Sequence, residues 1–294
     1  SWLFLGIGIG LGAVWAYVVL GWGGYWGWDP VENASLLSWL VGVALIHSFT
    51  VYRQRGAFKR WSVMCACLTF AFVIVGTFIS RSGLVQSVHA FEGDNVSLVL
   101  FGGLIAASVL AGIVGLIVRW KSFGPAKAGG DDISSMMSKD AAYYFNNLIM
   151  IVFTLMLTFM TIAPALPFNL KFSTGTYDAI ARPLGILYLI VLTACPLLSW
   201  GKTEGKQFWK RARIPGACAL VLFAVLMFYY ATYLLPSYQA NVAYYQELAA
   251  QGSVSASEML STLGPAWYYN GLTVVGLLVA SLLLFNSLFM LGRG

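Results

Sequence analysis

The sequence predicts an all-α integral membrane protein with about eight transmembrane helices. Of its 294 residues, 59% are hydrophobic and 10% are charged, whereas soluble domains have roughly 25% charged residues. Apolar stretches of about twenty residues recur along the chain, and each can cross about 30 Å of hydrocarbon as a helix. The stretches are continuous rather than alternating, which favours helices over a barrel, because lipid offers no partner to an unpaired backbone group. The predicted spans are residues 2–20, 34–52, 61–80, 96–119, 142–166, 183–200, 214–236 and 267–291.

Basic residues predict the orientation of these spans. Fourteen of the seventeen Lys and Arg residues fall on one side of the membrane, which leaves Arg81, Lys171 and Arg182 on the other. The positive-inside rule makes the richer side cytoplasmic. Both chain ends are then cytoplasmic, and the outward loops are the one after the first span and residues 81–95, 167–182 and 237–266. The formal charge of +6 is therefore a topological signal, and no basic stripe indicates nucleic-acid binding.

The chain divides into a membrane core at 1–119, a polar cytoplasmic linker at 120–141 and a C-terminal transmembrane bundle at 142–294. The first residue is not Met and lies in or beside a span, and no cleavable signal peptide is visible. We therefore expect the later part of a longer protein, or one piece of a split one.

The four cysteines predict neither a disulfide nor a metal site. Cys65 and Cys67 are two residues apart on a predicted helix, so they point to nearly opposite sides. Cys195 and Cys218 lie in separate apolar runs. We interpret all four as small buried hydrophobic residues.

The first span carries glycines at positions 6, 8, 10 and 12. Small residues at this spacing let helices approach closely in lipid, so they predict a helix–helix seam. Trp15 and Tyr17 lie near the outer end of this span, where they form either a wall of a ligand surface or an interfacial aromatic anchor.

The following loop has the sequence WGGYWGWDPVENAS and concentrates indoles, glycines and carboxylates in a short space. Glycines let the backbone approach a flat object, and indoles supply rigid apolar faces. The pattern fits a large planar ligand with a polar edge, for which haem is the leading candidate. The alternative is an aromatic belt at the bilayer surface, although a belt requires no glycines or acids at fixed positions. The candidate contact residues are Trp22, Gly23, Gly24, Tyr25, Trp26, Trp28 and Asp29.

The acids of this loop also have a structural interpretation. Pro30 suits the first turn of the next helix, with Asp29 as its N-cap and Glu32 in the same turn. The two interpretations are compatible, because an acid that fixes the start of a helix also fixes the neighbouring indoles before ligand arrives.

Three further polar residues in this half of the chain are candidate site residues. His47 lies about 20 Å along the second span, where ionisable groups are usually functional; it is either a metal ligand or a neutral imidazole bonded to a neighbouring helix. Arg81 is the only cation on the outward side of this half, and it suits either a haem propionate or lipid phosphate. His89, on the outward loop, is unremarkable by itself.

The later spans carry fewer signals. The paired amides of Asn146 and Asn147 are suited to hydrogen bonds across helices. The Met residues of the last four spans are interpreted as packing.

The Trp-rich loop resembles the "WWD" signature of the haem-handling proteins of cytochrome c biogenesis. Its continuation, PVENAS, is similar to the CcmF family, the cytochrome c haem lyases of system I, whereas the CcmC and CcsA families carry other residues after Trp-Asp. The likeness extends through ALIHS at 44–48, GTFISRSG at 76–83 and SVHAF at 87–91. It covers residues 1 to about 95 and is weak beyond them.

The resemblance implies haem ligands. It matches His89 to an outer His of the family, whose paired His lies upstream of residue 1, and His47 to one axial ligand of an embedded haem b. The family's second embedded ligand is a His near the end of the fifth span, but residues 161–168 contain none. The trans ligand is then another residue type, another chain or absent. The outward segment 237–266 is also shorter than the soluble domain that the family usually places there.

The resemblance further implies a function: haem held on the outer Trp-rich loop becomes attached through thioethers to a CXXCH apocytochrome c, with positioning rather than a protein nucleophile as the main contribution. Expected partners are a CcmE-like haem chaperone, CcmH/CcmI-like apocytochrome chaperones, apocytochrome c, and a companion chain that supplies further helices and the second outer His. The expected location is the inner or plasma membrane, or an organellar inner membrane. The alternatives are haem delivery or export as in the CcmC family, and a non-catalytic structural subunit.

Overall fold

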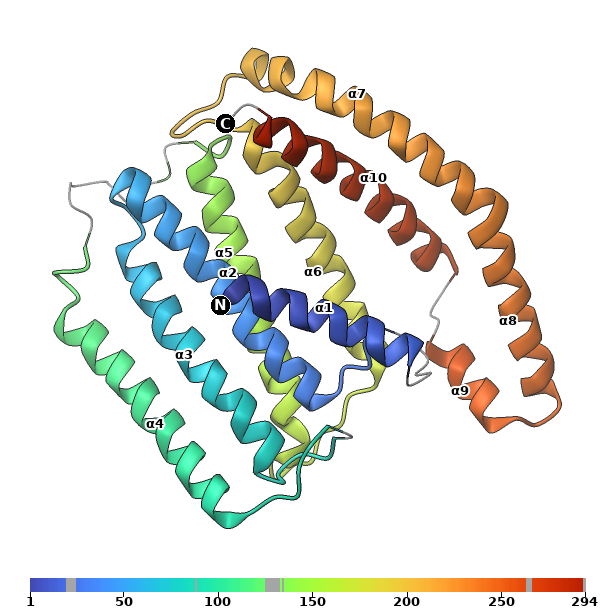
Figure 1. The fold of residues 1–294 in the computed structure, drawn as a ribbon, viewed down its shortest axis with the longest axis horizontal. Coiled ribbons are helices and arrows are strands. Elements are labelled where there is room, and N and C mark those ends of the chain that lie inside the picture. Colours follow the sequence, from blue (N-terminus) through green and yellow to red (C-terminus); the bar gives the residue numbers. More distant parts are fainter. Residues whose placement is uncertain (20–24, 88, 125–132, 134, 263–265, 293–294) are drawn as a thin grey trace. The chain divides into compact units, whose positions relative to one another are not determined.

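The computed structural model describes residues 1–19, 25–87, 89–124, 133, 135–262 and 266–292 (Figure 1). Every regular element in these ranges is helical. The chain forms two compact units, an N-terminal unit of Ser1–Ile133 with Tyr143–Phe172 and a C-terminal unit of Ser134–Ala142 with Ser173–Gly294. The fold class predicted from hydropathy, an all-α multi-pass membrane protein, is confirmed.

The N-terminal unit is a set of long apolar helices. In chain order these are α1 (Trp2–Val18), α2 (Pro30–Arg55), α3 (Lys59–Arg81), α4 (Asn95–Val118), α5 (Lys139–Ile162) and the short η1 (Ala163–Ala165). The first four residues of α5 belong to the C-terminal unit. Helix α2 packs against α1 and along α3, which packs in turn along α4 (Figure 1). The fully buried residues of α2, such as Leu37 and Val41, place this helix at the centre of the unit.

The C-terminal unit contains the remaining helices. They are α6 (Thr174–Ala194), η2 (Cys195–Leu197), α7 (Gly205–Tyr229), the π-helical turn η3 (Tyr230–Leu234), α8 (Leu235–Ala250), α9 (Val254–Thr262) and α10 (Ala266–Leu291). Helix α10 packs against both α6 and α7. Because α6, α7 and α10 are each long enough to span the hydrocarbon, the faces that they do not bury on one another can lie against lipid.

Each of the eight predicted spans coincides with a helix over most of its length, and seven helices among the described residues are long and apolar enough to cross a membrane. Helix α1, with 17 residues, is shorter. The predicted orientation of the ends and loops stays a prediction.

Helix α7 does not stop where its hydropathy falls. It continues through η3 into α8 as one helix from Gly205 to Ala250, about 69 Å long at the helical rise. The π-helical turn ends two residues before Pro236, whose missing N–H prevents a regular α-helical bond. The segment 237–266 therefore contains helices α8 and α9, which the hydropathy pattern did not predict.

The predicted seam on α1 is confirmed at one of its four glycines. A Cβ at Gly6 would lie 2.6 Å from Nε1 of Trp39, and a Cβ at Gly42 would lie 2.7 Å from Cδ1 of Trp2. The two indoles stack with ring centroids 5.3 Å apart, each against a glycine of the opposite helix. Cβ atoms at the other three predicted positions would meet nothing within 4 Å, so only one end of the glycine stripe packs on α2.

Candidate functional site

The start of α2 is fixed by a capping box. The Asp29 side chain accepts a hydrogen bond from the Val31 N–H at 2.9 Å, and Pro30 occupies the first turn. The Glu32 carboxylate accepts from the N–H groups of Asp29 at 3.2 Å and Gly27 at 3.0 Å. These bonds satisfy backbone donors that have no partner inside the helix. The N-cap role predicted for Asp29 is confirmed, and the box also holds the loop backbone that carries the indoles.

Asn33, which is fully buried, ties this loop to a helix far along the chain. Its Nδ2 donates to the Trp28 carbonyl at 3.0 Å and to Thr161 Oγ1 at 3.1 Å. Trp28 has φ +56°, a left-handed conformation that non-glycine residues adopt rarely and at a cost in energy. The hydrogen bond from Asn33 helps to hold this backbone, and therefore the direction of the Trp28 indole. The sequence analysis did not identify Asn33.

The described aromatic residues of the loop form two ring pairs. Trp26 and Trp28 are half-buried and meet edge to face, with centroids 6.2 Å apart. Tyr25 is 55% exposed and stacks on Tyr17 at 4.3 Å, so Tyr17 does join the loop surface. The Trp26 Nε1 is buried without an acceptor among the described residues, which leaves a polar group suited to an anionic oxygen. Trp22, Gly23 and Gly24 lie outside the described residues.

The outward loop between α3 and α4 is anchored next to the start of α2. Val85 is buried against Ala34 of α2 and Ile79 of α3. The two ends of the loop approach so closely that a Cβ at Gly93 would lie 2.6 Å from the Cα of Gly83. Gly83 also has φ +69°, a conformation that favours glycine. These contacts hold the loop beside the residues that cap α2.

His89, Ser87 and Asp29 meet in one hydrogen-bonded group. Ser87 Oγ donates to Asp29 Oδ1 at 2.6 Å, and His89 Nδ1 lies 3.2 Å from the same oxygen. Ser87 Oγ also accepts from the His89 N–H at 3.0 Å. A proton on Nδ1, donated to the carboxylate, assigns the imidazole lone pair to Nε2. A carboxylate behind a histidine in this way orients metal-ligating histidines in proteins.

The structure therefore brings together two predicted residues, Asp29 and His89, that are 60 positions apart in the sequence. Their side chains are 15% and 34% exposed, so the group lies at the surface. Ser87 was part of the quoted motif, but no spacing rule identified it as the residue that joins the two.

Arg81 lies at the end of α3, exposed, with its guanidinium 4.6 Å from the centroid of the Phe91 ring. This cation–π contact holds the guanidinium beside the outward loop. The nearby Asp94 caps α4, and hydrogen bonds from the Ser97 hydroxyl and backbone N–H lower the pKa of its carboxyl. Arg81 makes a smaller contribution in the same direction. Whether Arg81 meets a propionate or a phosphate stays a prediction.

His47 lies on α2, and its Nδ1 contacts the side-chain amide of Asn146 on α5. The next residues along both helices repeat the contact, because Asn147 Nδ2 donates to Ser48 Oγ at 2.9 Å. Asn146 Oδ1 is buried without a partner among the described residues. With the amide turned so that Oδ1 faces the ring, His47 Nδ1 donates the proton and the lone pair lies on Nε2; with Nδ2 facing the ring, Nδ1 accepts. The prediction that the paired amides bond across helices is confirmed.

The described residues contain no group of three or more His, Cys, Asp or Glu side chains that could hold a bare metal ion. A single imidazole at each of the two sites is instead suited to an iron whose other ligands come from a macrocycle.

Three comparisons with known proteins agree. The family model described as Cytochrome C assembly protein matches residues 1–86. The cytochrome c-type biogenesis protein CycK of Bradyrhizobium diazoefficiens is 37% identical over 231 residues, which are 77% of this chain and 34% of that protein. The cytochrome c-type biogenesis protein NrfE of Haemophilus influenzae is 60% identical over 95 residues, 32% of this chain and 15% of that protein.

A solved structure has a similar fold. It is named Cytochrome c Heme Lyase CcmF, is 29% identical, has a TM-score of 0.57, and is matched over 75% of this chain and 33% of its own length. The chain spans about a third of the length of the curated relatives that it matches.

Proposed function

Because this chain belongs to the CcmF family of cytochrome c-type biogenesis proteins, we propose that it is the part of a cytochrome c haem lyase that holds haem during thioether attachment. A role in cytochrome c maturation follows from the family. The activity of the whole protein is part of the proposal, since this chain spans only about a third of its relatives. The observation that carries the proposal is the hydrogen-bonded group of His89, Asp29 and Ser87 beside the Trp-rich loop.

In this proposal His89 Nε2 is the ligand to the iron of the substrate haem. A hydrogen bond from Nδ1 to the Asp29 carboxylate makes Nε2 more basic and fixes the plane of the ring. The capping box holds Asp29 through the α2 backbone, so the ligand rests on a helix start rather than on a loose loop.

The indoles of Trp26 and Trp28 would contact the porphyrin face, which is large, flat and apolar. The Nε1 of Trp26, which has no acceptor among the described residues, is a donor suited to a propionate oxygen. Arg81, held by Phe91 at the edge of the same outward loop, is the candidate partner for the second propionate. Trp22, Gly23 and Gly24 complete the proposed surface.

The attachment step needs positioning more than acid–base chemistry. Each cysteine thiol of the CXXCH segment adds across a haem vinyl group. The sulfur bonds to one vinyl carbon, the S–H bond breaks, and a hydrogen is added to the other vinyl carbon. No protein nucleophile is required, and holding the iron from one side leaves the vinyl edge accessible to the peptide. We name no catalytic residue in this chain.

We further propose that His47 holds an embedded haem b, which when bound supplies electrons that keep the delivered iron reduced. His47 would hold this group, because the amide of Asn146 can orient the imidazole and Asn146 Oδ1 lacks another donor among the described residues. The sequence contains only His47 and His89, so a further histidine at this depth would come from another chain or segment.

The partners proposed for this site are a CcmE-like haem chaperone, CcmH/CcmI-like apocytochrome chaperones and apocytochrome c. A companion chain or preceding segment would supply the second outer histidine and further helices. The bacterial inner membrane is the proposed location.

The experiment that tests this function compares His89→Ala with Gln86→Ala in cells that depend on the protein for cytochrome c. Gln86 is an exposed residue of the same loop. We expect His89→Ala to reduce the holocytochrome yield to background, because the iron loses its protein ligand, and Gln86→Ala to leave the yield unchanged. Normal yield with His89→Ala would refute the assignment.

Two further measurements separate the alternatives. A non-catalytic structural subunit would carry no haem after purification, whereas the proposed lyase component gives a pyridine haemochrome spectrum. A haem-delivery protein of the CcmC type would be trapped with the haem chaperone alone. The lyase component should be trapped with apocytochrome as well.

A further inference from the structure

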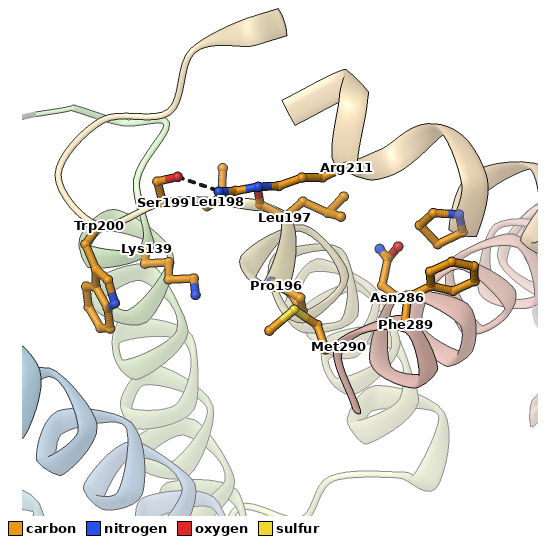
Figure 2. A pocket seen from close by; sticks show the side chains of 11 residues that line it. Lys139, Pro196, Leu197, Leu198, Ser199, Trp200, Arg211, Asn286, Phe289 and Met290 are labelled. Atoms are coloured by element: carbon orange, nitrogen blue, oxygen red, sulfur yellow. Dashed lines mark hydrogen bonds between the residues drawn. The ribbon is translucent and has the colours of Figure 1, made fainter. Parts of the chain in front are cut away.

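A cavity of about 330 Å³ lies in the C-terminal unit, where α5 and α7 begin and α6 and α10 end (Figure 2). Two cationic side chains line it, Lys139 from the first residue of α5 and Arg211 from the second turn of α7. Figure 2 shows the Lys139 side chain extending into the space framed by Trp200, Pro196 and Met290.

Both cations contact neutral groups. Arg211 Nη1 donates to the Leu197 carbonyl and to Ser199 Oγ, both at 3.0 Å. Lys139 Nζ lies 5.8 Å from the centroid of the Trp200 ring. No salt bridge found among the described residues includes either side chain. Two such charges lining one cavity create a positive potential that favours an anion.

An apolar groove continues from this cavity between α6, α7 and α10. It has a volume of about 630 Å³ and shares Leu197 and Asn286 with the cationic cavity. Along α7 its lining extends from Phe208 to Leu220, about 18 Å at the helical rise. That length exceeds half of the roughly 30 Å hydrocarbon thickness of a bilayer, which is the depth that one acyl chain occupies.

We propose that the cavity and groove together bind an anionic phospholipid, with the phosphate between Lys139 and Arg211 and one acyl chain along the groove. The cavity lies where membrane-spanning helices begin and end, which is the level of lipid headgroups. Trp200 beside the cavity and Trp209 beside the groove are residue types typical of that level. A free anion would use the cavity alone, whereas the adjoining groove fits the attached chain.

The first test measures lipid affinity of the full chain purified in detergent, with phosphatidylglycerol and the zwitterionic phosphatidylcholine as probes and native mass spectrometry as the readout. We expect the wild-type chain to retain phosphatidylglycerol in preference. The affinity of the double variant K139Q/R211Q for phosphatidylglycerol should be at least about tenfold lower, because both charges that meet the phosphate are gone.

The matched control is K206Q/K210Q, which also removes two charges, both from α7, the helix that carries Arg211. Both lysines are exposed and line neither cavity, so phosphatidylglycerol retention should stay at the wild-type level. Equal retention in the two double variants would overturn the proposal. If K139Q/R211Q does not fold, the test is the thermal unfolding midpoint of the wild-type chain with each lipid. Phosphatidylglycerol must raise this midpoint more than phosphatidylcholine does, and an equal shift overturns the proposal.

The second test addresses the groove. A Cβ at Gly216, on the groove, or at Gly185 of α6, outside both cavities, would meet nothing within 4 Å. We expect Gly216→Leu to weaken phosphatidylglycerol binding several-fold by occupying the groove, and Gly185→Leu to leave it unchanged. Inorganic phosphate should bind the wild-type chain far more weakly than phosphatidylglycerol. Comparable affinities for the two would identify an anion site without a lipid and overturn the proposal.

Discussion

The two histidines of this chain lie in contrasting surroundings. His89 is on the loop between α3 and α4, 34% exposed, with Nδ1 3.2 Å from the Asp29 carboxylate. His47 is on α2, a helix long and apolar enough to span the membrane, with Nδ1 against the Asn146 amide. In both rings Nδ1 meets the partner, so Nε2 is the candidate ligand atom in each.

The contrast relates the hydrogen-bond partner of each histidine, a carboxylate or an amide, to the position of that histidine outside or within a membrane-spanning helix. At the surface, water solvates a carboxylate, so Asp29 can be both an N-cap and a partner for imidazole. Within a span an isolated charge is costly, and a neutral amide fixes the ring without adding one. The same geometric device therefore makes the outer imidazole the more electron-donating of the two.

The largest effect is expected when each of the two histidines is replaced in turn. We expect His47→Ala to remove most of the haem b proposed to copurify with the chain, since that iron loses the imidazole that this chain supplies to it. His89→Ala should leave this haem in place and instead abolish haem capture at the outer loop. The pyridine haemochrome spectrum of each purified variant measures its haem b content. Crosslinking to the haem chaperone measures haem capture at the outer loop. Loss of the same haem in both variants would contradict two separate sites.

A smaller effect is expected when the outer partner loses its charge. Asp29→Asn keeps an N-cap of equal quality but removes the carboxylate behind His89, so the affinity of the outer loop for haem should fall about 10- to 100-fold. A haem titration followed by absorbance measures the change. The control is Asp94→Asn, which alters a second capping carboxylate, on α4, without touching His89. Equal losses in the two variants would mean that capping, not the histidine, explains the effect.

The corresponding change at the inner site is expected to be about tenfold. Asn146→Leu removes the amide behind His47 and should weaken retention of haem b, whereas Asn147→Leu removes only the contact with Ser48. Both variants lose one hydrogen bond between α2 and α5, so their thermal unfolding should shift similarly. Haem release to apomyoglobin then separates them. Identical release rates would rule out an orienting role for Asn146.

The smallest effect is expected at Asn33, which supports the Trp-rich loop through the Trp28 carbonyl, and it is an effect on stability. Asn33→Ala removes the hydrogen bonds to Trp28 and Thr161 and should reduce the free energy of unfolding by about 1–3 kcal/mol. Asn95→Ala, at an exposed position on α4, should change it by less than about 0.5 kcal/mol. Denaturation in detergent monitored by circular dichroism provides the measurement. A similar loss in both would remove Asn33 from the support of the loop.

Local patterns gave the parts of the site that depend on neighbours in the chain. The order Asp-Pro-Val-Glu predicted Asp29 as the N-cap of α2 with Glu32 in its first turn, because the bonds at this helix start join residues at most three positions apart. The same reasoning could not place Ser87 on Asp29, 58 residues away, or Thr161 on Asn33, 128 residues away. Those pairs depend on how α2 packs against α3 and α5. No pattern within one segment encodes that arrangement.

Sequence patterns alone identify a helical membrane protein, the approximate position of its spans, and a Trp-rich loop and two histidines as its candidate chemical features. Hydropathy and helix capping suffice for this, because lipid forces each span to satisfy its own backbone. Which residues meet is apparent only in the tertiary structure. The packing of Val85 brings His89 to Asp29, and polar contacts between α2 and α5 bring Asn146 to His47. The tertiary structure also shows that cations from two helices share one cavity. Such contacts follow from the packing of whole helices, whose register is a property of all their side chains together.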